Sequence, residues 1–303
     1  MLPSLQTKTP TNLLYSSLLT TFLCIFDTYF RSNGRTKYNK KNIKISIIIP
    51  FYKRLDFLSL ISQGLRRQSF NNYEVIIAED DNTPETITFL ESQIAKISVP
   101  IKHVSQPDTG FNKTKALNKS VKIAEGELLV FIDGDCIPHK HLLHEYNKHM
   151  EPNIILIGRR AMLSEKITNI LLKDDSIKKI NILNLLLSGS KKIEDAFYFP
   201  NRSYNNSHRG ICGCNWAVER KLLLKVNGFD EDYKYATAAE DTDIDWRLSK
   251  IGAKIKKMKN KAIVYHLYHD LNYNKTQVEI NKKLLHKKIK VGEAICKNGI
   301  TKL

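Results

Sequence analysis

Two clusters of acidic residues are the part of this chain best suited to chemistry. The first is Asp133-Gly134-Asp135, which directly follows the apolar run at residues 128–132. Carboxylates at the end of a buried strand are costly to desolvate unless positive charge lies nearby. Two aspartates in a glycine turn suit a hard divalent cation, Mn²⁺ or Mg²⁺, that also carries phosphate oxygens. The bland alternative is a turn whose carboxylates cap a helix that begins near Pro138.

The second cluster is Glu240-Asp241-Thr242-Asp243, at the head of a helix-like stretch. It offers a carboxylate without an obvious basic partner, which is what a general base requires. The same acids could instead be first-turn residues that the helix dipole favours. Together the two clusters predict metal-assisted transfer from a nucleotide diphosphate donor.

Strands and helices must bring these clusters together, and their pattern alternates through the first half of the chain. The pattern predicts strands at residues 44–50, 73–78, 101–105 and 127–132, and helices at 55–68, 84–96 and 112–124. Such alternation indicates βαβ units, hence an α/β fold with a mostly parallel central sheet flanked by helices. Ligands bind beyond the carboxyl ends of such strands, here residues 50–54, 79–82 and 133–135.

The pattern is less regular beyond Met150. We expect a strand at 153–163, an insertion beside the site at 164–208 with a helix at 177–187, helices at 220–226 and 241–251, and a strand at 262–265. A basic helix at 275–297 follows. The histidines at 139, 141, 144 and 149 are interpreted as a solvated helix face, and Arg159 and Arg160 as surface charge.

Charge is unevenly placed along the chain. Of the net +17, residues 1–44 contribute +6 and residues 250–303 contribute +11, so the part between them sums to zero. A neutral body with basic ends favours an anionic membrane surface or a phosphorylated acceptor, and argues against a nucleic-acid groove. A solvated lysine-rich surface would give the same composition.

The cysteines and the N-terminal segment indicate the compartment. Five scattered cysteines give no disulfide framework and fit a reducing, cytoplasmic location. Cys212 and Cys214 lack the second pair of a zinc site. Residues 9–26 are uncharged but less apolar than the roughly 20-residue run of a membrane span. We therefore expect residues 1–43 to be a separate segment that attaches to the inner face of the membrane.

These motifs together resemble the family 2 glycosyltransferases of GT-A fold. The resemblance covers about residues 44–269, and residues 44–270 would form the GT-A domain, followed by a basic C-terminal helix at 271–303. It is carried by residues 46–50 with Arg54, then 79–82, 106–118 with Gly110-Phe111, and 131–138. Residues 214–216, 226–231, 240–243 and 265–269 resemble the C-terminal segment shared by galactosyltransferases and bacterial chondroitin-type synthases.

The resemblance implies an inverting enzyme. It would move a hexose or N-acetylhexosamine from a nucleotide sugar, a UDP-sugar, to a hydroxyl of a glycan or lipid-linked acceptor in surface polysaccharide synthesis. Asp241 would be the base and Glu240 would position the acceptor. Asp135 would bind the metal directly, and Asp133 would contact the ribose or the metal through water. Two histidines follow the last strand of the domain, and of these we assign His266 to the metal.

The resemblance also assigns the substrate contacts. The nucleotide sugar would be bound by Pro50, Phe51, Arg54, Glu79, Asp80, Asn118, Asp133 and Asp135. Asp80 is preferred as the acceptor of the uracil N–H, although residues 79–81 could also be a solvated turn. The sugar or acceptor would contact Asn215, Trp216, Gly228 and Phe229.

Two departures and two rival functions accompany this assignment. Residues 236–239 replace the Gly-Trp-Gly that the family usually has, which leaves the sugar open. Asn112 stands where the family often has a basic residue, with Lys113 and Lys115 nearby.

A nucleotidyltransferase would require a glycine-rich phosphate loop after the first strand, and residues 50–54 provide none. A basic membrane- or nucleic-acid-binding protein with an inert site would need its charge along a groove.

Overall fold

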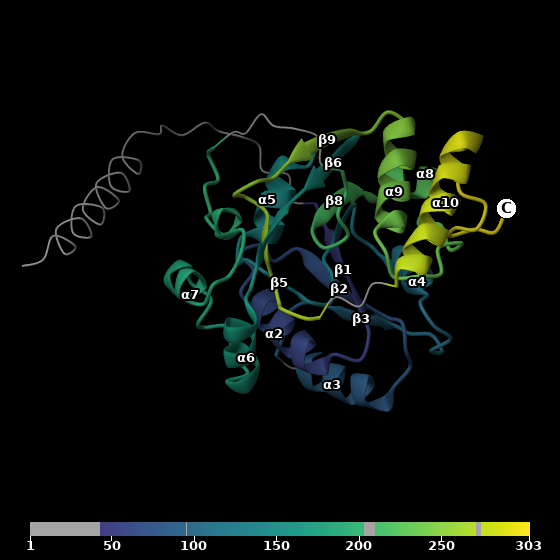
Figure 1. The fold of residues 1–303 in the computed structure, drawn as a ribbon. Helices are drawn as coiled ribbons and strands as arrows, with labels where there is room; N and C mark the ends of the chain where they lie inside the picture. Colours follow the sequence, from purple (N-terminus) through teal and green to yellow (C-terminus); the bar gives the residue numbers. More distant parts are fainter. Residues whose placement is uncertain (1–42, 95, 203–209, 271–273) are drawn as a thin grey trace, which may run out of the picture. The chain divides into compact units, whose positions relative to one another are not determined.

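The structure is a computed structural model that describes residues 43–94, 96–202, 210–270 and 274–303 (Figure 1). Residues 41–303 form one compact unit. The expected N-terminal segment, residues 1–43, lies almost entirely outside the described residues. None of the described helices combines the length and apolar character needed to cross a bilayer.

Two β-sheets form the centre of the described chain. Their strands are β1 Ile45–Phe51, β2 Tyr73–Glu79, β3 Ile101–Val104, β4 Leu128–Phe131, β5 Cys136–Pro138, β6 Ile154–Ile157, β7 Arg159–Met162, β8 Trp216–Glu219, β9 Lys254–Lys257 and β10 Ile263–His266. The larger sheet has the order β3-β2-β1-β4-β8-β6-β9 and the smaller one β5-β10-β7. Only β8 runs antiparallel to its neighbours in the larger sheet. The predicted α/β class with a mostly parallel sheet is confirmed.

Helices cover both faces of the larger sheet (Figure 1). They are α2 Leu55–Arg66, α3 Pro84–Ile94, α4 Lys113–Ile123, α5 Leu142–His149, α6 Glu165–Lys173, α7 Ile182–Leu187, α8 Arg220–Lys225, α9 Ala239–Lys250 and α10 Lys275–Val291, with a 3₁₀ turn, η1, at Ile193–Asp195. Alternate residues of β1 enter two separate cores. Ile47 packs with residues of α2 and α5, whereas Ile48 packs with α4, α8 and α9. Burial on both faces explains why these strands are continuous apolar runs.

The structure corrects the sequence reading of the second half. The single strand expected at 153–163 is two strands in different sheets, β6 and β7, because the chain turns at Gly158. The helix expected at 177–187 covers only Ile182–Leu187, and α6 precedes it in a stretch where no element was expected. The short strands β5, β8 and β9 were missed. Runs of three or four residues carry too little periodicity to predict.

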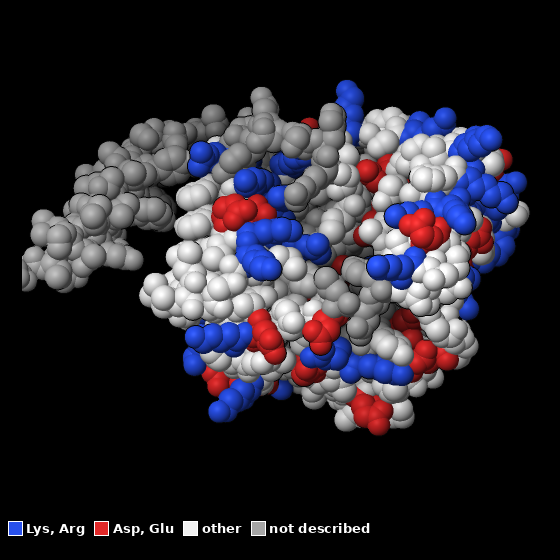
Figure 2. Space-filling view, in the orientation of Figure 1, with Lys and Arg blue, Asp and Glu red and all other residues white. Residues whose placement is uncertain are grey.

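The basic C-terminal helix, α10, packs along α9 (Figure 1). The segment beyond it is fixed by Asn227, whose side chain donates hydrogen bonds to the carbonyls of Cys296 and Thr301. Figure 2 shows Lys and Arg side chains gathered over α10. Part of this charge is paired, since Lys288 lies 2.6 Å from Asp230.

Candidate active site

The Asp133-Gly134-Asp135 turn lies at the carboxyl edge of the parallel strands, between β4 and β5. It packs against the end of β1 so closely that a Cβ on Gly134 would lie 2.5 Å from the Pro50 carbonyl oxygen. Only glycine allows this approach of two backbones. The turn is therefore fixed by β1, and Asp135 is aimed from it toward the end of β10.

Asp135, His266 and His269 form a group that can hold a metal ion. Asp135 Oδ2 lies 3.0 Å from His269 Nε2 and 3.4 Å from His266 Nε2. One ligand atom from each residue lies within 4.8 Å of the others. His266 Nδ1 is buried and has no hydrogen-bond partner among the described residues. One carboxylate and two imidazoles form a donor set that suits Mn²⁺, so the residues fit the expected cation.

The protonation states of Asp135 and His266 also suit a metal. By contrast, the hydrogen bond with Asp135 raises the pKa of His269, so that a cation would displace a proton from that ring. Burial alone would raise the pKa of Asp135, but the hydrogen bond from His269 and the charge of His266 outweigh it and lower the pKa to about 2. Burial lowers the pKa of His266. The carboxylate is thus ionised and the His266 imidazole neutral at pH 7, as metal ligands must be.

Asp133 has a different partner from the one expected. Its Oδ1 lies 2.9 Å from Lys113 Nζ, the amine of the first residue of α4. The group of three that could bind a metal does not include Asp133. The structure therefore places Lys113 beside the turn as a fixed positive charge, next to the Asn112 at which the resemblance expected a basic residue.

Asp241 lies in the first turn of α9, where the helix dipole favours a carboxylate. Its Oδ2 accepts a hydrogen bond of 2.7 Å from the backbone N–H of Gly213. A Cβ on Gly213 would lie 2.8 Å from Asp241 Oδ1, so a larger residue would displace the carboxylate. Sequence reasoning missed Gly213, whose only signal is a glycine shortly before the Asn215-Trp216 motif.

Glu240 and Asp241 are neighbouring carboxyl groups, of which Glu240 is buried and Asp241 half-buried. Burial and the nearby Asp241 raise the pKa of Glu240 to about 8. Burial also raises the pKa of Asp241, while Lys113 opposes this. Because Asp241 also accepts the Gly213 hydrogen bond, it is the member that ionises first. When one of the two is ionised, the negative charge therefore lies on Asp241, beside a protonated Glu240.

Asp243, in the same acidic cluster, has a structural role. Its Oδ2 lies 2.7 Å from Arg247, and both side chains are buried. Arg247 also donates to the carbonyl oxygens of Val226 and Gly228. This network connects α9 to the preceding turn and leaves Glu240 and Asp241 as the acids available for chemistry.

The loop before Glu240, which departs from the family pattern, is held from α10. The side-chain amide of Asn281 donates to the Tyr235 carbonyl and to Thr237 Oγ1, at 2.9 Å each. Thr237 Oγ1 in turn accepts from the backbone N–H of Ala239. The C-terminal helix therefore supports the start of α9, where Glu240 and Asp241 lie.

The four residues expected to contact sugar or acceptor are buried, although Asn215 also lines a small cavity beside Arg160 and Cys214, so their contact with a substrate stays a prediction. Trp216 is 1% exposed and stacks on Phe131 with ring centroids 4.6 Å apart, and Phe229 packs edge-on against both rings. Asn215 is 2% exposed and donates to the Arg159 carbonyl. The carbonyl of Gly228 is bonded to Arg247. In this structure the packing of Trp216 and Phe229 on Phe131 supports β4 and the turn after it.

Two of the expected donor-side residues are also buried. Glu79 is fully buried and lies 2.7 Å from His103 Nε2. The amide of Asn118 is bonded to the backbone of Phe229 and to Glu231. Asn118 uses both its amide nitrogen and its amide oxygen in these bonds, whereas Glu79 uses only Oε2 and keeps Oε1 buried without a hydrogen-bond partner among the described residues. Polar residues that follow a strand or lie on a helix can equally stabilise the fold.

The other donor-side residues lie at the carboxyl edges of β1 and β2. Asp80 accepts hydrogen bonds from Gln106 and from the backbone N–H of Asn112, at 2.7 Å each. Arg54 pairs with Asp56 at 2.7 Å. Pro50 is half-buried and Phe51 is buried. Asp80 keeps free lone pairs, so it remains the candidate for the uracil N–H.

The histidines at 139 and 141 do not form a solvated helix face. Both rings pack against Tyr198, with ring centroids 5.1 and 4.8 Å from that of Tyr198.

The two arginines that were interpreted as surface charge, Arg159 and Arg160, are half-buried. Arg159 lies 3.3 Å from the buried Asp195, and Arg160 donates to Cys214 Sγ.

Comparison with known families settles the class of this fold. Residues 46–226 match the glycosyl transferase family 2 model, which is more than half of the chain. The chain belongs to glycosyl transferase family 2. Residues 197–270 of this glycosyltransferase also match the model described as the N-terminal domain of galactosyltransferase. The family expected from the motifs is confirmed.

Relatives of this glycosyltransferase include two bacterial chondroitin synthases. It is 27% identical over 275 residues to that of Pasteurella multocida (strain Pm70), which covers 82% of this chain and 27% of the relative. It is 27% identical over 242 residues to that of Escherichia coli, which covers 73% of this chain and 34% of the relative. The chain thus spans between a quarter and about a third of these enzymes.

Solved structures confirm the GT-A fold of the glycosyltransferase. GalNAc-T7 with UDP, GalNAc and Mn²⁺ superimposes with a TM-score of 0.56 at 12% identity, covering 82% of this chain and 48% of that one. Staphylococcus aureus TarS with UDP-GlcNAc gives 0.54 at 17% identity, covering 82% and 66%. At these identities the similarity concerns the fold alone.

Proposed function

We propose that this glycosyltransferase moves a hexose or N-acetylhexosamine from a UDP-sugar to a hydroxyl of a glycan or lipid-linked acceptor, with inversion, in surface polysaccharide synthesis. The group of Asp135, His266 and His269 at the carboxyl edge of the sheet carries the proposal. The chondroitin synthases, and the TarS structures in complex with UDP or UDP-GlcNAc, support the donor and acceptor classes.

Asp135, His266 and His269 would hold Mn²⁺ or Mg²⁺. A cation bound there neutralises charge that develops on the departing diphosphate. The ammonium group of Lys113, beside Asp133, adds a second positive charge. This charge also favours the negatively charged diphosphate. Oδ1 of Asp133 is paired with Lys113. In this proposal the other oxygen of Asp133 contacts the ribose of the donor.

Asp241 would act as the general base. It accepts the proton of the acceptor hydroxyl while that oxygen bonds to the anomeric carbon and the bond to the diphosphate breaks. A single displacement inverts the anomeric configuration and needs no nucleophile on the enzyme. The transition state has oxocarbenium character, as in glycoside hydrolysis. The protonated Glu240 next to Asp241 can donate a hydrogen bond to the acceptor.

The proposal is tested by following UDP release from a panel of UDP-sugars with Mn²⁺, with Mg²⁺ and with EDTA. We expect release that depends on the metal and on an acceptor, and a product of inverted anomeric configuration by NMR. Release of pyrophosphate would instead indicate a nucleotidyltransferase. Absence of turnover with every donor and acceptor class would favour a binding protein with an inert site.

The pH dependence tests the pairing of Glu240 with Asp241. Ionisation of Asp241 gives kcat/KM an acid limb, and ionisation of Glu240, whose pKa is raised to about 8, gives an alkaline limb. Glu240→Gln keeps a neutral hydrogen-bond donor at this position. We expect it to retain the acid limb, lose the alkaline limb and raise the acceptor KM more than it lowers kcat. An unchanged alkaline limb would assign that ionisation to another group.

We further propose that the basic ends attach the cytoplasmic enzyme to the inner membrane face. Each basic residue near an anionic surface contributes about 1 kcal/mol, and salt screens this attraction. Full-length protein is expected to sediment with anionic vesicles but not with neutral ones, and less so without residues 1–40. If it does not sediment with anionic vesicles at low salt, the attachment is ruled out.

A further inference from the structure

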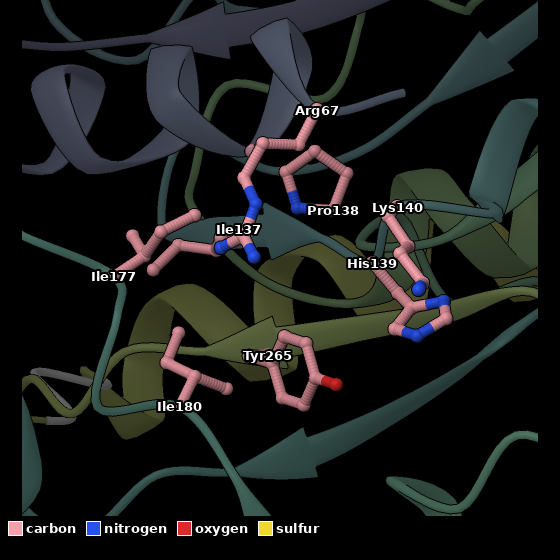
Figure 3. Close-up of a pocket in the computed structure, with 9 residues that line it drawn as sticks. Arg67, Ile137, Pro138, His139, Lys140, Ile177, Ile180 and Tyr265 are labelled. Carbon is pink, nitrogen blue, oxygen red and sulfur yellow. The ribbon is translucent and has the colours of Figure 1, made fainter. Parts of the chain in front are cut away.

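A second cavity lies on the reverse side of the small sheet that carries the metal-binding group. Strands β5 and β10 pair Tyr265 with Ile137 and His266 with Cys136. Successive side chains of a strand point to opposite faces. Tyr265 and Ile137 therefore face away from His266, and they line a cavity of about 200 Å³ (Figure 3). This cavity is separate from the place where the donor diphosphate would bind.

Two cationic side chains border this cavity. Arg67 follows the end of α2, and Lys140 lies between β5 and α5; Figure 3 shows them on different sides of the cavity. Both side chains are exposed, and neither forms an ion pair within the part of the chain that the structure describes. Uncompensated positive charge at a concave, partly apolar site raises the local concentration of anions.

Neutral hydrogen-bonding groups complete the lining. Burial, together with the charges of His141, Lys140 and Arg67, lowers the pKa of His139 to about 4, although Glu145 opposes this. His139 is therefore neutral at pH 7. Its Nδ1 accepts from the backbone N–H of His141, at 3.3 Å, so that Nε2 carries the proton.

The Tyr265 hydroxyl is a further donor at this cavity. Figure 3 shows the ring of Tyr265 at the floor of the cavity. Its hydroxyl has no hydrogen-bond partner in the ranges that the structure describes. Tyr265 is half-buried and its hydroxyl is open to the cavity, so this hydroxyl is available to a ligand. Ile137, Ile177 and Ile180 supply apolar walls.

We propose that this cavity binds an oxyanion, a carboxylate or a phosphate, carried by a compact molecule or by the end of a larger one. The guanidinium of Arg67 and the ammonium of Lys140 would pair with the oxyanion, because both are free cations at one site. The isoleucine walls would contact the body of the molecule.

The test is calorimetric titration of the full-length protein after divalent metal has been removed on a chelating resin, so that no metal-bound anion contributes and no soluble carboxylate competes. The two probes are inorganic phosphate and glucuronate, a sugar that carries a carboxylate. Binding of either one supports the proposal, and the tighter of the two identifies the source of the oxyanion. If neither binds, the proposal is overturned.

Variants locate the binding. Arg67→Gln combined with Lys140→Gln should weaken the observed affinity at least about tenfold, since each removes a charge-assisted hydrogen bond. Arg66→Gln combined with Lys148→Gln removes the same charge from neighbouring positions outside the cavity and should change affinity less than about twofold. Equal losses of affinity in the two double variants, or no loss of affinity in the Arg67→Gln and Lys140→Gln double variant, would overturn the proposal. If the first double variant does not fold, Lys140→Gln alone decides by the same comparison with Lys148→Gln.

Discussion

Replacing Asp241 with Asn is expected to lower kcat by about 10²–10⁴-fold, the usual contribution of a general base. Asparagine keeps the size of the side chain, and its Oδ1 can still accept the Gly213 N–H hydrogen bond. Only the ability to take a proton is lost. Donor affinity should hardly change, because the metal-binding group and Asp80 lie on other elements. Initial rates of UDP release and calorimetric UDP binding in the presence of Mn²⁺ measure the two effects separately.

Asp245→Asn is the matched control for this substitution. Asp245 lies one turn further along α9 and is half-buried, so the variant removes equal charge from the same helix. We expect its kcat to stay within a few-fold of the unmodified enzyme. If Asp241→Asn transfers sugar at a near-normal rate, the base is another residue, and Glu240 is the first to test.

The sequence predicted the parts of the site that follow strong local patterns. The run before Asp133 is apolar throughout because β4 is buried on both faces, so the position of the Asp133-Gly134-Asp135 turn at a strand end could be inferred. Glu240 and Asp241 were placed at the start of a helix because a helix-like stretch follows them. Both clusters are local in sequence, and their chemistry depends on residue type and spacing alone.

The partners of these clusters depend on contacts between distant segments. Asp133 pairs with Lys113, and Asp241 accepts from Gly213, but no periodicity links either pair. Asp243 differs from Asp241 only because Arg247 follows it by one helical turn and lies in the interior. Trp216 is a buried core residue of β8, although its motif resembles a sugar contact. The sequence pattern alone does not indicate this burial. Such distinctions require the fold.

Asp135→Ala is expected to abolish the Mn²⁺-dependent component of UDP binding. The substitution removes the only carboxylate of the metal-binding group formed with His266 and His269. Two neutral imidazoles alone provide too little negative charge to hold a hard divalent cation together with a diphosphate. The variant should still unfold cooperatively, since the Asp135 side chain serves this group and not the hydrophobic core. Mn²⁺ titration followed by electron paramagnetic resonance, and UDP calorimetry with and without EDTA, measure the loss.

Asp133→Asn is the matched control, because it removes a carboxylate two residues earlier in the same turn. If the metal is held by Asp135, His266 and His269, Mn²⁺ affinity should fall far less in Asp133→Asn than in Asp135→Ala, and His269→Ala should resemble Asp135→Ala. Equal losses at Asp133 and Asp135 would restore the ligand set inferred from sequence, in which Asp133 reaches the metal through water. Metal-dependent UDP affinity that survives in Asp135→Ala would mean that the cation, if one is used, lies elsewhere.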